Sequence, residues 1–400
     1  MLSDRIGLIS DSPTLAVSAM AREMKSRGID VVDFGAGQPD FSPPEHVKQA
    51  AVRAAHENAG YTPASGLPEL RKAVCEKLRK ENSIEYSPEE VIISVGAKHA
   101  LYNAFQALLN PGDEVIIPVP YWVSYPDMVR LAGGTPVFAQ AGRDFTLSAD
   151  HVTEEFSQRT KALVINSPNN PSGAVFPGSE IKKAASAAAE KGILIISDEI
   201  YEKMVYEGRH TSPASMSEEI KNMTVTVNGL SKSHAIPGWR LGYAAGPGDV
   251  IKAMGKLQSQ STSNPSSISQ RAAMAGLEYG SLPEGILEEY GKRRDLVVQG
   301  LNSIEGLSCA TPRGAFYAFP RVDMDMGKGT GIPGMPGLGD KEPGCTDDVG
   351  FSRMLLEKAG VAVVPGSAFG MPGHIRISYA TSQDRIAEGL ERIRSFMASF

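Results

Sequence analysis

The sequence predicts an α/β protein with a mainly parallel seven-stranded sheet flanked by helices, and a smaller α+β domain beside it. Short apolar runs that end in Gly, Pro, Asn or Asp alternate with helical patterns, and this alternation is typical of parallel sheets. The 400 residues are enough for two or three domains, and 42% hydrophobic with 22% charged residues is usual for a soluble globular protein.

Seven candidate strands occupy the middle of the chain. They are residues 91–95, 114–118, 135–138, 162–166, 193–197, 224–228 and 242–245. Helices are expected between them, for example over residues 98–109, 125–132 and 180–191. We therefore expect residues 42–280 to form the larger domain.

After residue 280 the pattern changes to long helices and short strands. The expected elements are helices over 287–304 and from 383 to the end, and strands over 314–320, 361–364 and 374–378. A strand candidate at 31–34 predicts that residues 1–41 join residues 281–400 in the smaller domain. Glycine and proline cluster in residues 327–344, which we expect to form a surface loop or lid.

Charge and composition exclude several classes of protein. Forty basic and 46 acidic residues leave a net charge of -6, so no positive field is expected to hold nucleic acid. The apolar runs are shorter than the ~20 residues that cross a bilayer, and the first ten residues lack the apolar region of a signal peptide. The three cysteines and seven histidines show no disulfide or metal-ligand spacing. We expect a cytoplasmic protein with no membrane, nucleic-acid or metal partner.

Polar side chains follow the predicted strands at the edge where open α/β sheets bind ligands. Lys232 follows one strand, and Arg240 comes eight residues later. Asp198 and Tyr201 follow a second strand, and Asn170 follows a third. Taken singly, a lysine after a strand is usually solvated. The convergence of these residues at one edge favours a catalytic site.

Six motifs in order resemble the class I aminotransferases, which are pyridoxal-phosphate-dependent enzymes of fold type I. The motifs are GAGQPDF, YTPASG, SPNNPSG, SDEIY, SKSHAIPGWRLGY and HIRISYA, and they span nearly the whole chain. The chain is most similar to the bacterial aspartate and aspartate/prephenate subgroup. The resemblance implies transfer of the amino group of L-aspartate to 2-oxoglutarate by a ping-pong mechanism. Prephenate, aromatic or alanine specificity and a β-lyase activity remain alternatives.

The resemblance assigns roles around the cofactor, pyridoxal 5′-phosphate. Lys232 forms a Schiff base with its aldehyde and later acts as a general base. Asp198 keeps the pyridine nitrogen protonated. Tyr201 and Asn170 hydrogen-bond the phenolic oxygen, and Trp122 stacks on the ring.

The cofactor phosphate has its own set of implied partners. They are the helix start at Gly96, Ala97 and Lys98, the guanidinium of Arg240, and Tyr61 of the neighbouring subunit. The last of these implies a homodimer with shared active sites. The chain has Gly229 where many relatives have a hydroxyl residue, and whether Ser231 replaces that hydroxyl stays open.

The same resemblance implies the residues that hold the amino acid and 2-oxo acid substrates. Arg376 clamps the α-carboxylate together with the backbone at Gly37, and Trp122 and Asn170 lie alongside. Lys98 stands where members of the subgroup bind the distal carboxylate of a dicarboxylic substrate.

Overall fold

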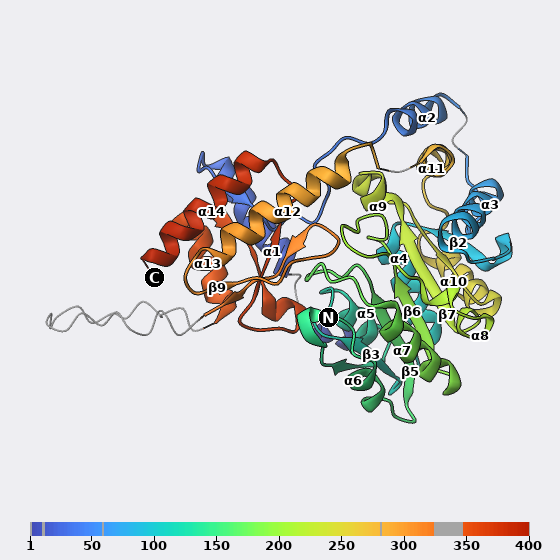
Figure 1. Cartoon of the computed structure of the whole chain (residues 1–400). Coiled ribbons are helices and arrows are strands. Elements are labelled where there is room, and N and C mark those ends of the chain that lie inside the picture. The colour runs from blue at the N-terminus through green and yellow to red at the C-terminus, as the bar shows by residue number, and fades with distance from the viewer. Residues whose placement is uncertain (1, 10–12, 58–59, 281, 324–346, 400) are drawn as a thin grey trace, which may run out of the picture.

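The computed structural model describes residues 2–9, 13–57, 60–280, 282–323 and 347–399. Two lobes are visible in Figure 1: one holds the central sheet with its helices, and the other gathers the first helix and the last three. The predicted loop at 327–344 lies outside the described residues. The division at residues 42–280 stays a prediction.

The larger lobe contains the predicted seven-stranded sheet, in the order β2-β8-β7-β6-β5-β3-β4. Its strands are β2 (Val91–Ser94), β3 (Glu114–Pro118), β4 (Thr135–Ala139), β5 (Thr160–Asn166), β6 (Leu194–Asp198), β7 (Thr224–Gly229) and β8 (Gly242–Ala245). Only β8 runs antiparallel to its neighbours, β2 and β7. The remaining neighbours pair in parallel, so the mainly parallel sheet is confirmed.

Helices cover both faces of this sheet, which explains why its strands are apolar on both sides. In β5, Val164 packs with side chains of α4 (Ala97–Leu108) and α10 (Gly248–Ser261), while Leu163 and Ile165 pack against α7 (Gly178–Glu190). The other helices of this lobe are α2 (Glu45–His56), α3 (Pro68–Lys77), α5 (Tyr125–Leu131), α6 (Ala149–Glu154), α8 (Glu218–Lys221), α9 (Leu230–Ser233) and α11 (Ser267–Tyr279).

The smaller lobe joins both ends of the chain. Its helices are α1 (Pro13–Ser26), α12 (Ile286–Asn302), α13 (Asp348–Ala359) and α14 (Gln383–Ala398). Its strands are β1 (Val32–Asp33), β9 (Leu307–Ser308), β10 (Tyr317–Ala318), β11 (Arg321–Val322), β12 (Val361–Ala362), β13 (Val364–Pro365) and β14 (Ile375–Ser378). Because β1 pairs with β12, the N-terminal segment belongs to this lobe.

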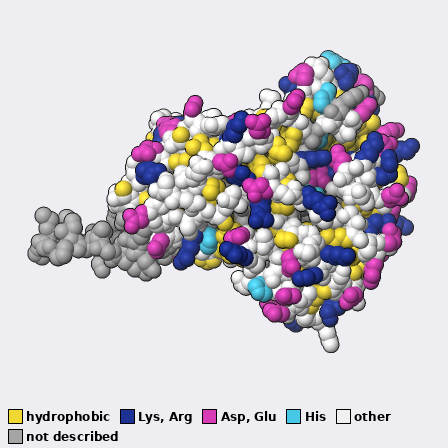
Figure 2. Space-filling model, viewed as in Figure 1, with side chains coloured by type: hydrophobic (Ala, Val, Ile, Leu, Met, Phe, Trp, Pro, Cys, Tyr) yellow, Lys and Arg dark blue, Asp and Glu magenta, His cyan; other side chains and the backbone are white. Residues whose placement is uncertain are grey.

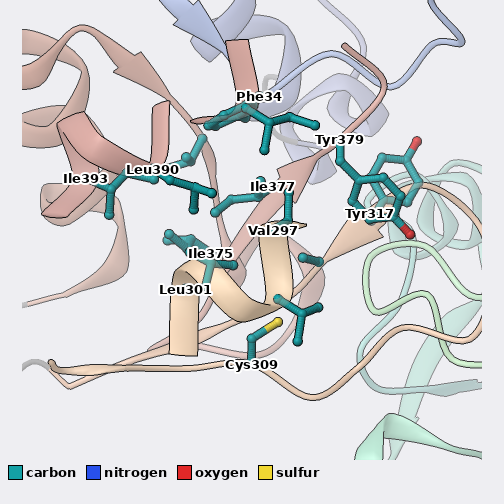
Figure 3. Close-up of a cluster of buried hydrophobic side chains, with 14 of the residues drawn as sticks. Phe34, Val297, Leu301, Cys309, Tyr317, Ile375, Ile377, Tyr379, Leu390 and Ile393 are labelled. Atoms are coloured by element: carbon teal, nitrogen blue, oxygen red, sulfur yellow. The ribbon is translucent and has the colours of Figure 1, made fainter. Parts of the chain in front are cut away.

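One apolar core holds the smaller lobe together (Figure 3). Val297 and Leu301 of α12 pack with Ile377 of β14 and with Leu390 of α14. Phe34, directly after β1, closes the same core. The burial of this core fixes β14, and β14 carries one of the predicted site residues.

Two predicted strands are wrong in extent. Residues 314–320 form only the two-residue β10, because Ala315 has a positive φ of 56° that breaks the extended backbone. Residues 361–364 divide at Val363, since β12 pairs with β1 whereas β13 pairs with β14. The strands of the larger lobe lie within two residues of their predicted limits.

The surface carries charges of both signs. Figure 2 shows basic and acidic side chains interspersed over the visible face. Of the helices in the described ranges, none has the length and apolar character needed to span a membrane.

Candidate active site

A cavity of about 290 Å³ lies where β5, β6 and α9 end. Asn166 and Asp198 are the last residues of β5 and β6, and Lys232 lies on α9, directly after β7. Arg376 of β14 and Tyr317 of β10 line the same cavity from the smaller lobe. The two lobes therefore build the site together, at the sheet edge that the sequence predicts.

All predicted site residues except Gly96 and Tyr61 line this cavity. The predicted residues that line it are Gly37, Ala97, Lys98, Trp122, Asn170, Asp198, Tyr201, Lys232, Arg240 and Arg376. Gly96 directly precedes Ala97 as the N-cap of α4. Tyr61 lies outside the cavity, and 96% of it is exposed to solvent.

The carboxyl group of Asp198 is buried at the end of β6. The hydroxyl of Tyr125 donates a hydrogen bond of 2.7 Å to Oδ2, and the backbone N–H of Ile200 donates one of 3.2 Å to Oδ1. Burial nevertheless raises the pKa of Asp198 from 3.8 to about 6. A cation placed next to this carboxyl would favour its ionised form.

The amine of Lys232 points across the cavity and donates a hydrogen bond to the carbonyl of Gly37. Burial, followed by the charges of Arg376 and Arg240, lowers the pKa of Lys232 from 10.5 to about 8. A lysine amine with a lowered pKa is a better nucleophile near neutral pH, because more of it is unprotonated.

Arg376 is 3% exposed, and its guanidinium is held from two sides. Nη1 donates to Oδ1 of Asn170 at 3.0 Å, and Nη2 donates to the carbonyl of Gly35 at 2.8 Å. The ring of Tyr317 lies 4.6 Å away. Within the described chain, the buried Nε of Arg376 has no hydrogen-bond partner. A carboxylate entering the cavity would supply the missing acceptor.

The start of α4 and the guanidinium of Arg240 lie together at one side of the cavity. Gly96 has a φ of +82°, and a Cβ there would lie 2.6 Å from Nη2 of Arg240, so the guanidinium lies directly over this turn. A Cβ at Gly229 would lie 2.9 Å from the Cα of Gly242, which explains why this chain has no side chain at that position. The hydroxyl residue Ser231 lines the cavity instead.

Lys98 lines the cavity at its open side, where the residue is also exposed to solvent. Its ammonium lies 4.8 Å from the ring centroid of Trp122. Burial, followed by the charge of Arg240, lowers the pKa of Lys98. The ring of Trp122 in turn packs edge-on against Tyr125, with centroids 5.3 Å apart.

Three residues that contact the predicted site were missed in the sequence. The hydroxyls of Tyr317 and Tyr201 lie 2.7 Å apart, and Tyr125 bonds Asp198 as described. Asn166 donates to the carbonyl of Asp198 at 3.0 Å and accepts from the N–H of Asn170 at 3.0 Å. The polar end of an otherwise apolar strand was a signal for Asn166. The two tyrosines carried no such signal, because buried tyrosines are common in cores.

Comparison with known proteins identifies the family. The family model described as "Aminotransferase class I and II" matches residues 29–393. The chain belongs to this family. The aminotransferase is 46% identical to a probable aspartate/prephenate aminotransferase of Aquifex aeolicus, over 98% of both chains. It is 45% identical to the aspartate aminotransferase of Geobacillus stearothermophilus, over 99% of this chain and 98% of the relative.

Solved structures agree with this assignment. The aminotransferase resembles the aspartate aminotransferase of Thermus thermophilus with maleate, with a TM-score of 0.88 and 44% identity over 99% of both chains. It also resembles the enzyme of Rhizobium meliloti, with a TM-score of 0.89 and 44% identity over 100% of this chain and 99% of that one. The chain is thus an aminotransferase in both sequence and fold.

Proposed function

We propose that this aminotransferase moves the amino group of L-aspartate to 2-oxoglutarate, by a ping-pong mechanism, with pyridoxal 5′-phosphate as its cofactor. The observation that supports this most directly is the cavity itself. It brings the amine of Lys232, with its lowered pKa, close to the guanidinium of Arg376, which has an unsatisfied donor. The amine of Lys232 can attack a carbonyl carbon, and the guanidinium of Arg376 can bind a carboxylate.

The residues of the cavity fit pyridoxal phosphate. Asp198 is a buried carboxyl that needs a cation beside it, and a protonated pyridine nitrogen is such a cation. The turn at Gly96 and the guanidinium of Arg240 suit a phosphate, with the hydroxyl of Ser231 as a further donor. When bound, the cofactor supplies an electron sink and a carrier for the amino group.

Lys232 acts twice in this scheme. Its neutral amine would hold the cofactor through the aldehyde, for which the lowered pKa of Lys232 is suited. When it does not hold the cofactor, the same amine would serve as the general base for the proton on the substrate Cα, a role that suits a pKa of about 8. Its hydrogen bond to Gly37 shows how the amine is held when it is free.

Asn170 and Tyr201 would hold the phenolic oxygen of the cofactor. Since Oδ1 of Asn170 accepts from Arg376, its side-chain N–H is left to donate. The hydroxyl of Tyr201 is oriented by the hydroxyl of Tyr317 at 2.7 Å. Trp122 is proposed to stack on the ring.

Arg376 and Lys98 are proposed to bind the two carboxylates of the substrate. The planar guanidinium of Arg376 can clamp the α-carboxylate with two parallel hydrogen bonds. Lys98 lines the same cavity and carries the charge that a distal carboxylate needs. The Thermus thermophilus relative was solved with maleate, which is a dicarboxylate, and this agrees with a dicarboxylic substrate here.

We also propose that the enzyme is a cytoplasmic homodimer. Tyr61 is a large side chain that is almost fully exposed. Contact with a second copy would cover it and bring its hydroxyl to the partner's phosphate site.

A screen of amino donors tests the proposed function. The protein loaded with pyridoxal phosphate is mixed with L-aspartate, L-alanine or L-phenylalanine, and absorbance follows conversion to the aminated cofactor. We expect L-aspartate to react fastest, and 2-oxoglutarate to restore the starting spectrum. Faster reaction with L-alanine or L-phenylalanine would overturn aspartate specificity. Release of ammonia without a reversible spectral change would favour a β-lyase.

A further inference from the structure

Two glutamates with buried carboxylates directly follow the site residues Asp198 and Tyr201, at the end of β6 and on the turn after it. Glu199 directly follows Asp198, and Glu202 directly follows Tyr201. Neither glutamate lines the cavity, although the residues before them both do. The turn thus presents one pair of side chains to the cavity and the next pair to the protein interior.

Glu199 is 1% exposed, and both of its oxygens accept hydrogen bonds. The hydroxyls of Ser197 and Ser212 donate to Oε1 at 2.8 and 2.6 Å. Nε2 of His210 lies 2.9 Å from Oε2. Burial alone would lower the pKa of His210, but the charge and the hydrogen bond of Glu199 raise it. Nε2 of His210 thus lies within hydrogen-bond reach of Glu199, whereas its buried Nδ1 has no hydrogen-bond partner within the described chain.

Glu202 is held in a similar way from α3 and the turn after it. The ammonium of Lys77 donates to Oε1, and the amide of Asn82 donates to Oε2 at 2.8 Å. Lys77 also donates to Oδ1 of Asn82 at 2.8 Å. Burial would raise the pKa of Glu202, but Lys77 and then His210 outweigh it and lower this pKa to about 2.

These groups form one buried cluster. A carboxylate oxygen of Glu199, a carboxylate oxygen of Glu202 and a ring nitrogen of His210 all lie within 4.8 Å of one another. The ammonium of Lys77 lies against Glu202 and 3.6 Å from Glu81, and the imidazole of His210 lies against Glu199. Each of the two carboxylates therefore has a basic partner from the protein itself. Buried charges that are paired in this way resist displacement, because separating a pair leaves an uncompensated charge.

The backbone of the turn has few anchors of its own. The N–H of Glu199 bonds the carbonyl of Val227 at 2.9 Å, and this is the last link to β7. After it, the N–H of Glu202 bonds only within the turn, to the carbonyl of Glu199 at 2.9 Å. The next link to another segment is at Met204, whose carbonyl accepts a hydrogen bond from the N–H of Ala315 at 2.8 Å. Between these two links, the side chains of the two glutamates anchor the turn.

We propose that Glu199 and Glu202 are positioning residues, and that their buried cluster with Lys77 and His210 sets where the carboxyl of Asp198 and the hydroxyl of Tyr201 lie. The proposal rests on the proposed function, since it concerns the two groups that would contact the cofactor. A shift of about 1 Å at such groups can lower a rate by about a hundredfold.

The variants Glu199→Gln and Glu202→Gln test this proposal, with Glu288→Gln as the matched control. Glu288 also forms an ion pair, with Lys292 at 2.7 Å, but this pair is exposed on α12 and lies outside the cluster. Three properties are measured on the loaded enzyme: kcat and KM for L-aspartate, the pH midpoint of the absorbance of the cofactor bound to Lys232, and the melting temperature.

We expect kcat to fall about tenfold or more in both glutamine variants, with KM changed by less than about threefold. We expect the absorbance midpoint to move by about half a unit, because the Tyr201 hydroxyl no longer lies at its place. The control should match the wild type. A lower melting temperature with unchanged kcat and midpoint would overturn the proposal and leave the cluster a purely stabilising role.

A milder variant covers the case in which the glutamine variants do not fold. Ser212→Ala removes one hydrogen bond to Glu199 and leaves every charge in place. We expect a kcat about threefold lower and a shifted midpoint. Wild-type values for both would overturn the proposal. If the wild type itself shows no visible cofactor band, the proposed function fails instead, whatever the variants do.

Discussion

Arg376 donates a hydrogen bond of 3.0 Å from Nη1 to Oδ1 of Asn170, although 206 positions separate the two residues. Arg376 comes from β14 of the smaller lobe, and Asn170 follows β5 of the larger one. The bond joins the proposed carboxylate clamp to a proposed cofactor ligand. A substrate that binds Arg376 is therefore held in register with the cofactor ring.

The Arg376→Lys variant should lose most of its catalytic efficiency. A lysine keeps the charge but cannot make two parallel hydrogen bonds to a carboxylate or reach Asn170 and Gly35 at the same time. We expect kcat/KM for L-aspartate to fall about a hundredfold. Steady-state kinetics measure this, with Arg392→Lys, at an ion pair with Asp30, as the control. A loss of less than about fivefold would contradict the assignment.

The Asp198→Asn variant should be more stable than the wild type when both lack cofactor. Burial raises the pKa of Asp198 from 3.8 to about 6, so the folded state binds this proton more tightly than the unfolded state. The stability that the protonated carboxyl of Asp198 contributes is fully present below about pH 4, and it is lost as the pH rises through about 6. The full shift corresponds to about 3 kcal/mol.

Urea unfolding at two pH values measures this effect. At pH 7.5 we expect Asp198→Asn to raise the free energy of unfolding by about 1–3 kcal/mol, and at pH 4 to leave it nearly unchanged. The same variant should bind pyridoxal phosphate more weakly. If the variant is less stable than the wild type at pH 7.5, the ionised carboxyl of Asp198 does not destabilise the cofactor-free protein, and the account of this residue is wrong.

The rate at which the cofactor joins Lys232 should depend on pH with a bend near 8. Burial and two guanidinium charges lower the pKa of this amine to about 8, and only the neutral amine attacks an aldehyde. We expect the rate to rise about tenfold per pH unit below the bend and to level off above it. Stopped-flow absorbance from pH 6 to 10 measures it. A rate that still rises at pH 10 would indicate an ordinary lysine pKa.

The Lys98→Ala variant should separate dicarboxylic from monocarboxylic substrates. Lys98 lines the cavity, and its charge has no carboxylate partner among the ion pairs of the described chain. We expect kcat/KM for L-aspartate to fall about thirtyfold or more, and that for L-alanine to change by less than about threefold. Equal losses for the two substrates would remove the basis for assigning the distal carboxylate to Lys98.

Much of the fold and of the site could be predicted because both depend on local patterns. Asp198, Asn170 and Lys232 follow apolar strands, and parallel strands end at one edge of a sheet, so their convergence follows from chain order. The helical pattern placed the start of α4 one residue late, at residue 98, and the resemblance supplied Gly96 and Ala97. The six motifs then supplied residues from the smaller lobe that no strand pattern could place.

Other features depend on contacts between distant segments, which no local pattern reports. Tyr317 orients the hydroxyl of Tyr201 only because β10 packs beside β14. The cluster around Glu199 needs α3 and the segment at His210 to meet at the turn after β6. The break at Ala315 arises from a positive φ, which alanine rarely adopts and which its sequence context did not signal.

Reduction of the loaded enzyme with borohydride, followed by digestion and mass spectrometry, tests the central claim most directly. Borohydride fixes the cofactor to whichever lysine holds it. We predict the mass of the reduced cofactor on the peptide that contains Lys232, and its absence from the Lys232→Ala variant. A modification at another lysine, or no modified peptide from a yellow protein, would contradict the account of this site.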